Sequence, residues 1–144
     1  MIEQDTVKLL RECDAGVRMG ISSIGDVLDS VHSPALQKLL RDSREDHERL
    51  GEKIDALLQR YQDEGKSPPA VAKGMSWLKS NVKLAVDGSD QTVADLMIDG
   101  CDMGVKSLSR YLNQYAAADE SSKEIAKDLI HIEEQLAVDL RDYL

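Results

Sequence analysis

The chain has 144 residues, of which 42% are apolar and 31% charged, with no Phe, one Trp and three Pro. This length and composition suit one helix-rich globular domain over residues 1–144 and exclude a disordered chain. A formal net charge of −9 argues against a nucleic-acid-binding protein, which needs Lys and Arg to displace phosphate counterions. No apolar run is long enough to span a membrane, the acidic N-terminus lacks a signal peptide, and two cysteines make no disulfide framework, so we expect a cytoplasmic protein.

Two long helices are predicted in the first half of the chain, because apolar residues recur there at helical spacing. The first covers residues 2–30 and the second residues 33–64. Ser33 suits the N-cap of the second helix, and Pro34 suits its first helical position.

Two further long helices are predicted after a long connection, at residues 90–117 and 121–143. The sequence SSKE at 121–124 has the pattern of a capping box, which would begin the last helix. The connection itself, residues 65–89, opens with GKSPP and then contains a short amphipathic segment at 71–86.

The lengths of the three connections predict the topology. Short joins make antiparallel hairpins of the first two and the last two helices, and one long crossover between hairpins is the ferritin-like connection. The hairpins also resemble each other, since CDAGVR at 13–18 returns as CDMGVK at 101–106, and residues 36–58 align loosely with 122–144. We therefore predict an all-α, antiparallel four-helix bundle of the ferritin-like kind, built from two repeated hairpins.

One ionisable residue per predicted helix falls on or beside the apolar stripe: Asp14, His47, Asp102 and Glu133. The hairpin alignment pairs the two Asp residues with each other and His47 with Glu133. Buried carboxylates must be paired, protonated or metal-bound. If the four groups converge on the bundle axis, three oxygen donors and one imidazole can hold a single Fe, Mn or Zn ion.

A structural role competes with the metal site. His47 can pair with an acid across the bundle in a polar layer that sets helix register without a ligand. His131 lies off the stripe and His32 lies at a helix junction, so both are expected on the surface. Cys13 and Cys101 are read first as small buried hydrophobes, and as a redox pair only if their Cα atoms lie within about 7 Å.

Two more sets of residues, the glycines inside the predicted helices and the lysines of the crossover, each allow more than one explanation. Each internal glycine costs up to about 1 kcal/mol relative to Ala, which is explained by close helix approach or by room for a ligand. The crossover has no acid between Lys66 and Val86, so it forms a basic patch that solvates an amphipathic helix or meets an acidic partner or a second copy. The helix glycines are Gly16, Gly20, Gly51, Gly100 and Gly104, and the lysines are Lys66, Lys73, Lys79 and Lys83.

The chain resembles a family of small bacterial ferritin-like four-helix-bundle proteins that carry only a domain-of-unknown-function label. The resemblance covers most of the chain and rests on GMSWLK at 74–79 and DGCD at 99–102. The wider ferritin-like group implies a di-iron or di-manganese site with Glu on two helices and Glu-x-x-His on the other two. This chain departs from that pattern, because Arg44 precedes His47 by three residues and Leu136 follows Glu133 by three. At most, the resemblance implies a metal-site remnant at the four residues named above.

Three functions follow from these observations. The first is a non-catalytic helical protein that acts through self-association or protein contacts, and a stress-related role is one version of it. It predicts a homo-oligomer, with a dimer as the first expectation. The second is a metal-binding or redox protein that uses the inner polar residues. The third is a binder of a small ligand in the bundle core.

Overall fold

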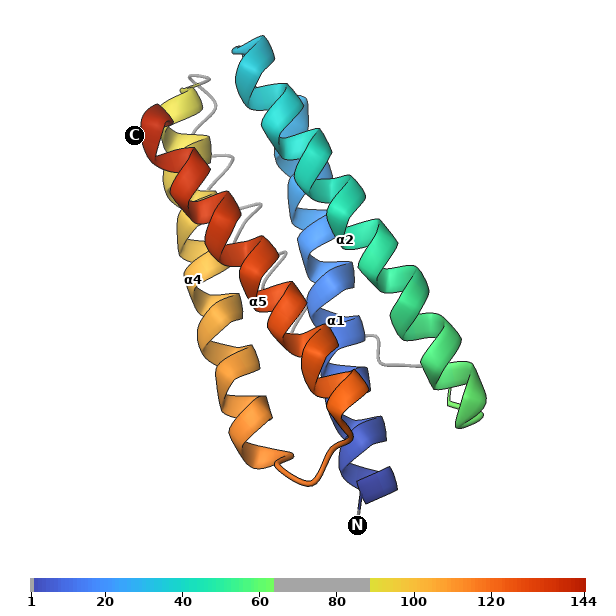
Figure 1. Cartoon of the computed structure of the whole chain (residues 1–144). Helices are drawn as coiled ribbons and strands as arrows, with labels where there is room; N and C mark the ends of the chain where they lie inside the picture. Colours follow the sequence, from blue (N-terminus) through green and yellow to red (C-terminus); the bar gives the residue numbers. More distant parts are fainter. Residues whose placement is uncertain (1, 64–88) are drawn as a thin grey trace.

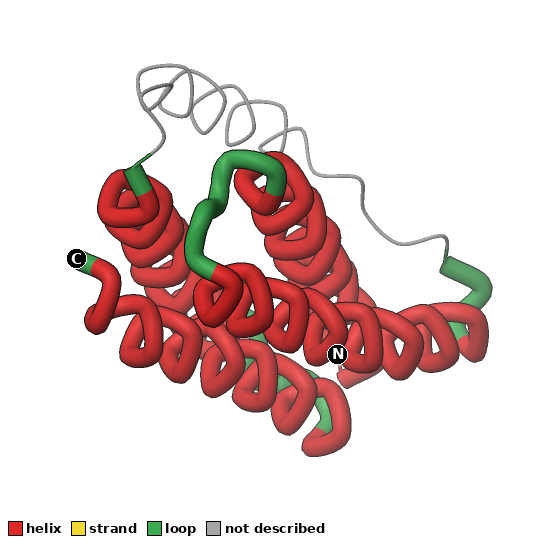
Figure 2. Tube along the Cα trace, turned by 90° about the horizontal axis from the view of Figure 1, so that it is seen from above, coloured by secondary structure: helices red, strands yellow, loops and turns green. Residues whose placement is uncertain are grey.

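The computed structural model describes residues 2–63 and 89–144, and these residues form four long helices and one short 3₁₀ turn (Figure 1). The long helices are α1 (Ile2–Leu28), α2 (Pro34–Arg60), α4 (Asp90–Gln114) and α5 (Glu120–Leu140), and the 3₁₀ turn is η1 (Arg141–Tyr143). Viewed from above, the described part of the chain contains helices and loops and no strand (Figure 2). The predicted all-α four-helix bundle is confirmed. The predicted short helix at 71–86 lies outside the described residues.

The start of α2 follows the sequence, whereas the start of α5 corrects it. Ser33 caps α2, since its hydroxyl accepts a hydrogen bond from the Leu36 N–H at 3.3 Å. The predicted capping box at Ser121 is wrong, because the N-cap is Asp119, whose carboxylate accepts from the Ser122 N–H at 2.8 Å. An Asp is as good an N-cap as Ser, and here it lies two residues earlier.

The helices also end earlier than their apolar stripes suggest. The expected end of the second helix at residue 64 becomes Arg60, because Gln62 adopts a left-handed conformation (φ 56°) and the Asp63 N–H turns back to the Leu58 carbonyl at 3.0 Å. The expected end of the third at residue 117 becomes Gln114. The Ala117 N–H instead donates to the Asp5 carboxylate of α1 at 3.1 Å.

The path of the chain gives the bundle its ferritin-like connection. α1 and α2 form one antiparallel hairpin, and α4 and α5 form another (Figure 1). α2 ends at one end of the bundle and α4 begins at the other, so α2 and α4 run in the same direction (Figure 1). In a simple up-and-down bundle α2 and α4 would run in opposite directions, so their shared direction matches the connection of ferritin-like bundles.

Polar side chains fasten the two hairpins together at both ends. At one end the Asp90 carboxylate accepts hydrogen bonds from the backbone N–H groups of His32 at 2.8 Å and Ser33 at 2.9 Å. At the other end the Thr6 hydroxyl accepts one from the Asp119 N–H at 2.8 Å. These bonds satisfy N–H groups in the loops and fix the hairpins against each other.

The hydrophobic core consists of two clusters, one toward each end of the bundle. Along α1 one cluster ends at Val17 and the other begins at Ile24, and along α5 the corresponding residues are Leu129 and Leu136. Three buried polar residues, Ser43, His47 and Glu133, lie in the stretch between the clusters. Within the described helices, none is long and apolar enough to cross a membrane.

Candidate functional site

A buried histidine–glutamate pair lies between the two core clusters. His47 of α2 is 1% exposed and Glu133 of α5 is 9% exposed, and His47 Nε2 lies 2.9 Å from Glu133 Oε1. Each residue occupies a core-facing position of its helix, between Leu40 and Leu50 for the histidine. The packing of α2 against α5 therefore brings together two of the four residues that the sequence predicts as inward-facing.

The hydrogen bonds of the His47 ring fix its protonation pattern. Nδ1 lies 2.7 Å from the Ser43 carbonyl oxygen, which can only accept, so Nδ1 carries a proton and donates it. One proton then lies between Nε2 and Glu133 Oε1. Whether imidazolium donates to carboxylate or a carboxylic acid donates to neutral imidazole, both ring nitrogens have a partner.

The surroundings of His47 favour the charged ring. Burial lowers the pKa of His47, but the hydrogen bond and charge of Glu133, the Ser43 carbonyl and the charge of Asp46 together outweigh it. The net result is a pKa above the ordinary value for histidine. The protonated ring is therefore favoured more strongly than in a free histidine, and both of its N–H groups have acceptors.

Gly20 on α1 makes room for this pair, whereas a Cβ on Gly104 of α4 would only be in ordinary contact with it. A Cβ on Gly20 would lie 2.6 Å from His47 Cδ2 and Nε2, and a Cβ on Gly104 would lie 3.7 Å from the Glu133 carboxylate. The sequence left open whether such glycines serve close packing or a ligand. At Gly20 the space is filled by the imidazole ring, so close packing explains it.

Cys101 of α4 also borders the pair, and its thiol is held in the neutral form. Burial raises the thiol pKa, and the charge of Glu133 and hydrogen bonding to it raise it further. The second cysteine, Cys13, is buried in the core cluster that contains the N-terminal half of α1. Burial and the charges of Glu12 and Asp14 raise its pKa to about 12. Both are free thiols of low reactivity, as their reading as small buried hydrophobes predicts.

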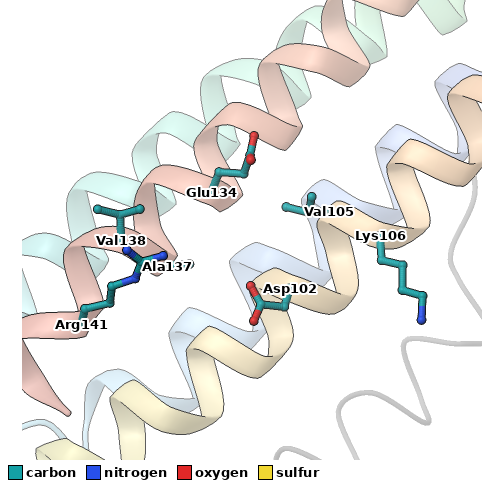
Figure 3. A pocket seen from close by; sticks show the side chains of 7 residues that line it. All are labelled: Asp102, Val105, Lys106, Glu134, Ala137, Val138 and Arg141. Carbon is teal, nitrogen blue, oxygen red and sulfur yellow. The ribbon is translucent and has the colours of Figure 1, made fainter.

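The two aspartates of the predicted site have different surroundings from the His47–Glu133 pair. Asp14 is 2% exposed, and its carboxylate lies 3.2 Å from the Arg18 guanidinium one helical turn away. Asp102 is exposed on α4 (Figure 3). Across residues 2–63 and 89–144, no group of three or more His, Cys, Asp or Glu side chains is placed to hold a metal ion.

A surface groove between α4 and α5 was not expected from the sequence. Its volume is about 270 Å³, and Figure 3 shows Asp102 and Val105 on the side of α4 that faces Glu134 and Val138 of α5, whereas the Lys106 side chain extends away from α5. In the sequence, the groove could have been suspected only from Val138, an apolar residue that lies away from the buried face of α5 formed by Ile125, Leu129, Leu136 and Leu140. The full lining is Asp102, Val105, Lys106, Glu134, Ala137, Val138 and Arg141.

The remaining sequence candidates lie outside the site. His32 and His131 are exposed, as expected. The lysines predicted to form a basic patch, Lys66, Lys73, Lys79 and Lys83, fall outside the described residues.

Comparison with known proteins supports the fold and assigns no function. No family model and no curated protein matches this chain. Among solved structures, a DUF305 fragment from Deinococcus radiodurans matches with a TM-score of 0.75 over 96% of this chain and 93% of that one. The sequences are 14% identical, so the match shows a shared fold and carries no residue roles. The chain thus has the helical fold of that DUF305 fragment.

Proposed function

We propose that this protein is a non-catalytic helical bundle that acts through self-association and contacts with other proteins. The observation that supports the proposal most is the placement of exposed apolar side chains. Within the described residues, the large hydrophobic side chains that stand out from the surface are Met103, Val138 and Leu144, at 61%, 45% and 57% exposure. All three belong to the second hairpin and its C-terminal end, and Val138 lines the groove between α4 and α5.

The interior supports the same proposal because its reactive groups are already engaged. Both ring nitrogens of His47 have partners, and the two thiols have raised pKa values. The buried Ser43 hydroxyl has no hydrogen-bond partner, but His47 Nδ1 donates to the Ser43 carbonyl and so is no base for that hydroxyl. This leaves the described core without a nucleophile–base pair.

Sedimentation velocity over a wide concentration range tests the proposal. We expect a reversible or stable oligomer, with a dimer as the smallest assembly. A chain that stays monomeric at every concentration, and that retains no protein partner in pull-down experiments, would contradict it. Elemental analysis of the same sample is expected to find no stoichiometric metal.

A metal-binding role is the second candidate, and the meeting of His47 and Glu133 favours it. An ion would replace the proton shared by Nε2 and Oε1 and would need further ligands, for which the sequence proposes Asp14 and Asp102. Protein made in medium supplemented with Fe, Mn or Zn decides between the candidates. Bound metal together with a melting temperature that rises on metal addition would establish this role in place of the first.

A further inference from the structure

We infer that the α4–α5 groove is the surface on which a second copy of this chain docks, with the two α5 helices antiparallel across a twofold axis. This inference rests on the proposed self-association and adds the surface and the residue pairing. It follows from the make-up of the groove, the spacing of its charges and the contrast with the first hairpin.

The groove carries its own complementary charges. Its apolar lining is Val105, Ala137 and Val138, and Val138 is 45% exposed. Around these side chains lie two acids, Asp102 and Glu134, and two bases, Lys106 and Arg141 (Figure 3). The protein as a whole carries a net charge of −9, so two copies repel each other over most approaches. At this groove the local charges balance, so the repulsion between copies is weaker there than the net charge implies.

The spacing of the charges along α5 and at the start of η1 fits a twofold contact. Glu134 lies three residues before Ala137, and Arg141 lies three residues after Val138. The charges are therefore symmetric about the midpoint between those two apolar residues and lie two helical turns apart on one face. If two α5 helices cross antiparallel at that midpoint, each Glu134 meets the Arg141 of the other copy. An isologous interface requires this reciprocity.

The corresponding stretch of the first hairpin is buried. Asp14 and Ala15 of α1, which align in sequence with Asp102 and Met103 of α4, are 2% and 7% exposed. In α4 the aligned aspartate is exposed and Met103 is 61% exposed. The same stretch of sequence is thus covered in one hairpin and open in the other, next to the groove. This contrast selects the second hairpin for the contact.

Charge-reversed variants test the pairing directly. In Glu134→Arg, like charges face each other twice across the dimer, and the same holds for Arg141→Glu. Each variant alone is expected to dimerise at least about tenfold more weakly than the wild type. An equimolar mixture of the two restores both Glu–Arg pairs, so a heterodimer with wild-type affinity is expected by sedimentation velocity.

Matched controls on the same helix separate the groove from general charge effects. Asp128→Arg and Lys127→Glu change the net charge by the same amounts at exposed α5 positions outside the groove, and both should dimerise like the wild type. Val138→Lys gives a second disruption of the groove that does not depend on the Glu134–Arg141 pairing. Far-UV circular dichroism confirms that each variant is folded.

The outcomes distinguish this inference from the proposed function. A wild-type protein that is monomeric throughout overturns this inference, and it overturns the proposed function as well if pull-down experiments find no protein partner. A wild-type dimer that persists in all three groove variants overturns the groove as the interface and leaves self-association standing. If the single variants are monomeric but their mixture stays monomeric too, the antiparallel pairing is wrong.

Discussion

The His47 ring on α2 occupies the space that Gly20 leaves on α1, where a Cβ would lie 2.6 Å from the ring. The ring cannot easily move aside, because Ser43 holds one of its nitrogens and Glu133 of α5 holds the other. One side chain thus relates three helices to one another. A buried polar contact of this kind sets helix register, since a shifted helix would leave a buried polar group unpaired.

Gly20→Ala is predicted to destabilise the protein by about 1–3 kcal/mol, because the added methyl group overpacks a ring that two hydrogen bonds hold in place. Gly25→Ala is the matched control on the same helix. A Cβ at Gly25 meets nothing within 4 Å, so this change should stabilise by up to about 1 kcal/mol through helix propensity. Urea unfolding measures both, and equal effects at the two positions would refute the packing role of Gly20.

Glu133→Ala is predicted to cost about 2–4 kcal/mol, because it leaves the buried His47 ring without its acidic partner. Asp128→Ala, at an exposed α5 position, is the control and should change the stability by no more than about 0.5 kcal/mol. The free energy of unfolding from urea titration is the readout. A Glu133→Ala protein as stable as the control would show that the pair contributes little.

The pH dependence of stability follows from the raised pKa of His47. The folded state holds the His47 proton more tightly than the unfolded chain does, so the stabilisation is complete below the unfolded pKa of about 6.5. It is lost as pH rises through the higher folded pKa. Urea unfolding at a series of pH values should show this decline in the wild type.

Glu133→Gln should reverse the sign of that dependence. Without the carboxylate, burial becomes the dominant influence and lowers the pKa of the folded His47, so the unfolded state binds more protons near neutral pH. The contribution of His47 to stability should then rise with pH. Parallel pH profiles in the wild type and the variant would contradict the assignment to this pair.

The cysteines should be protected from thiol reagents in the folded protein. Both thiols are buried and have raised pKa values, which for Cys13 is about 12, so the reactive thiolate is scarce at neutral pH. We expect a disulfide reagent to modify both cysteines promptly in urea and only slowly without it. Rapid modification of the native protein would instead support a redox role for the two cysteines.

Much of the fold was accessible from the sequence because its apolar stripes are long and regular. The pairing of His47 with Glu133 was also within reach, since each residue occupies or borders a stripe. The same reasoning sets Asp102 at the edge of the α4 stripe, from which it could reach the bundle axis, yet it is exposed. A helical wheel does not fix the bundle axis to within one helical position, and on α4 that difference decides between the core and the surface.

The remaining differences come from tertiary contacts that local patterns do not contain. Asp119 rather than Ser121 caps α5, and its N–H is itself held by Thr6 of α1. The α4–α5 groove combines residues from two helices, and only Val138, an apolar residue away from its helix stripe, hinted at it. A pattern within one helix cannot show which of its outer faces a neighbouring helix leaves open.

His47 and Glu133 share a proton, and a metal ion bound between them would have to displace it. Nitrogen NMR of the His47 ring, recorded with and without added Zn²⁺, distinguishes the two states. We expect protons on both ring nitrogens at about pH 6, below the ordinary pKa of histidine, and no change in either resonance when Zn²⁺ is added. Loss of the Nε2 proton on addition of one equivalent of Zn²⁺, with a shift of that nitrogen, would show that the pair binds metal instead.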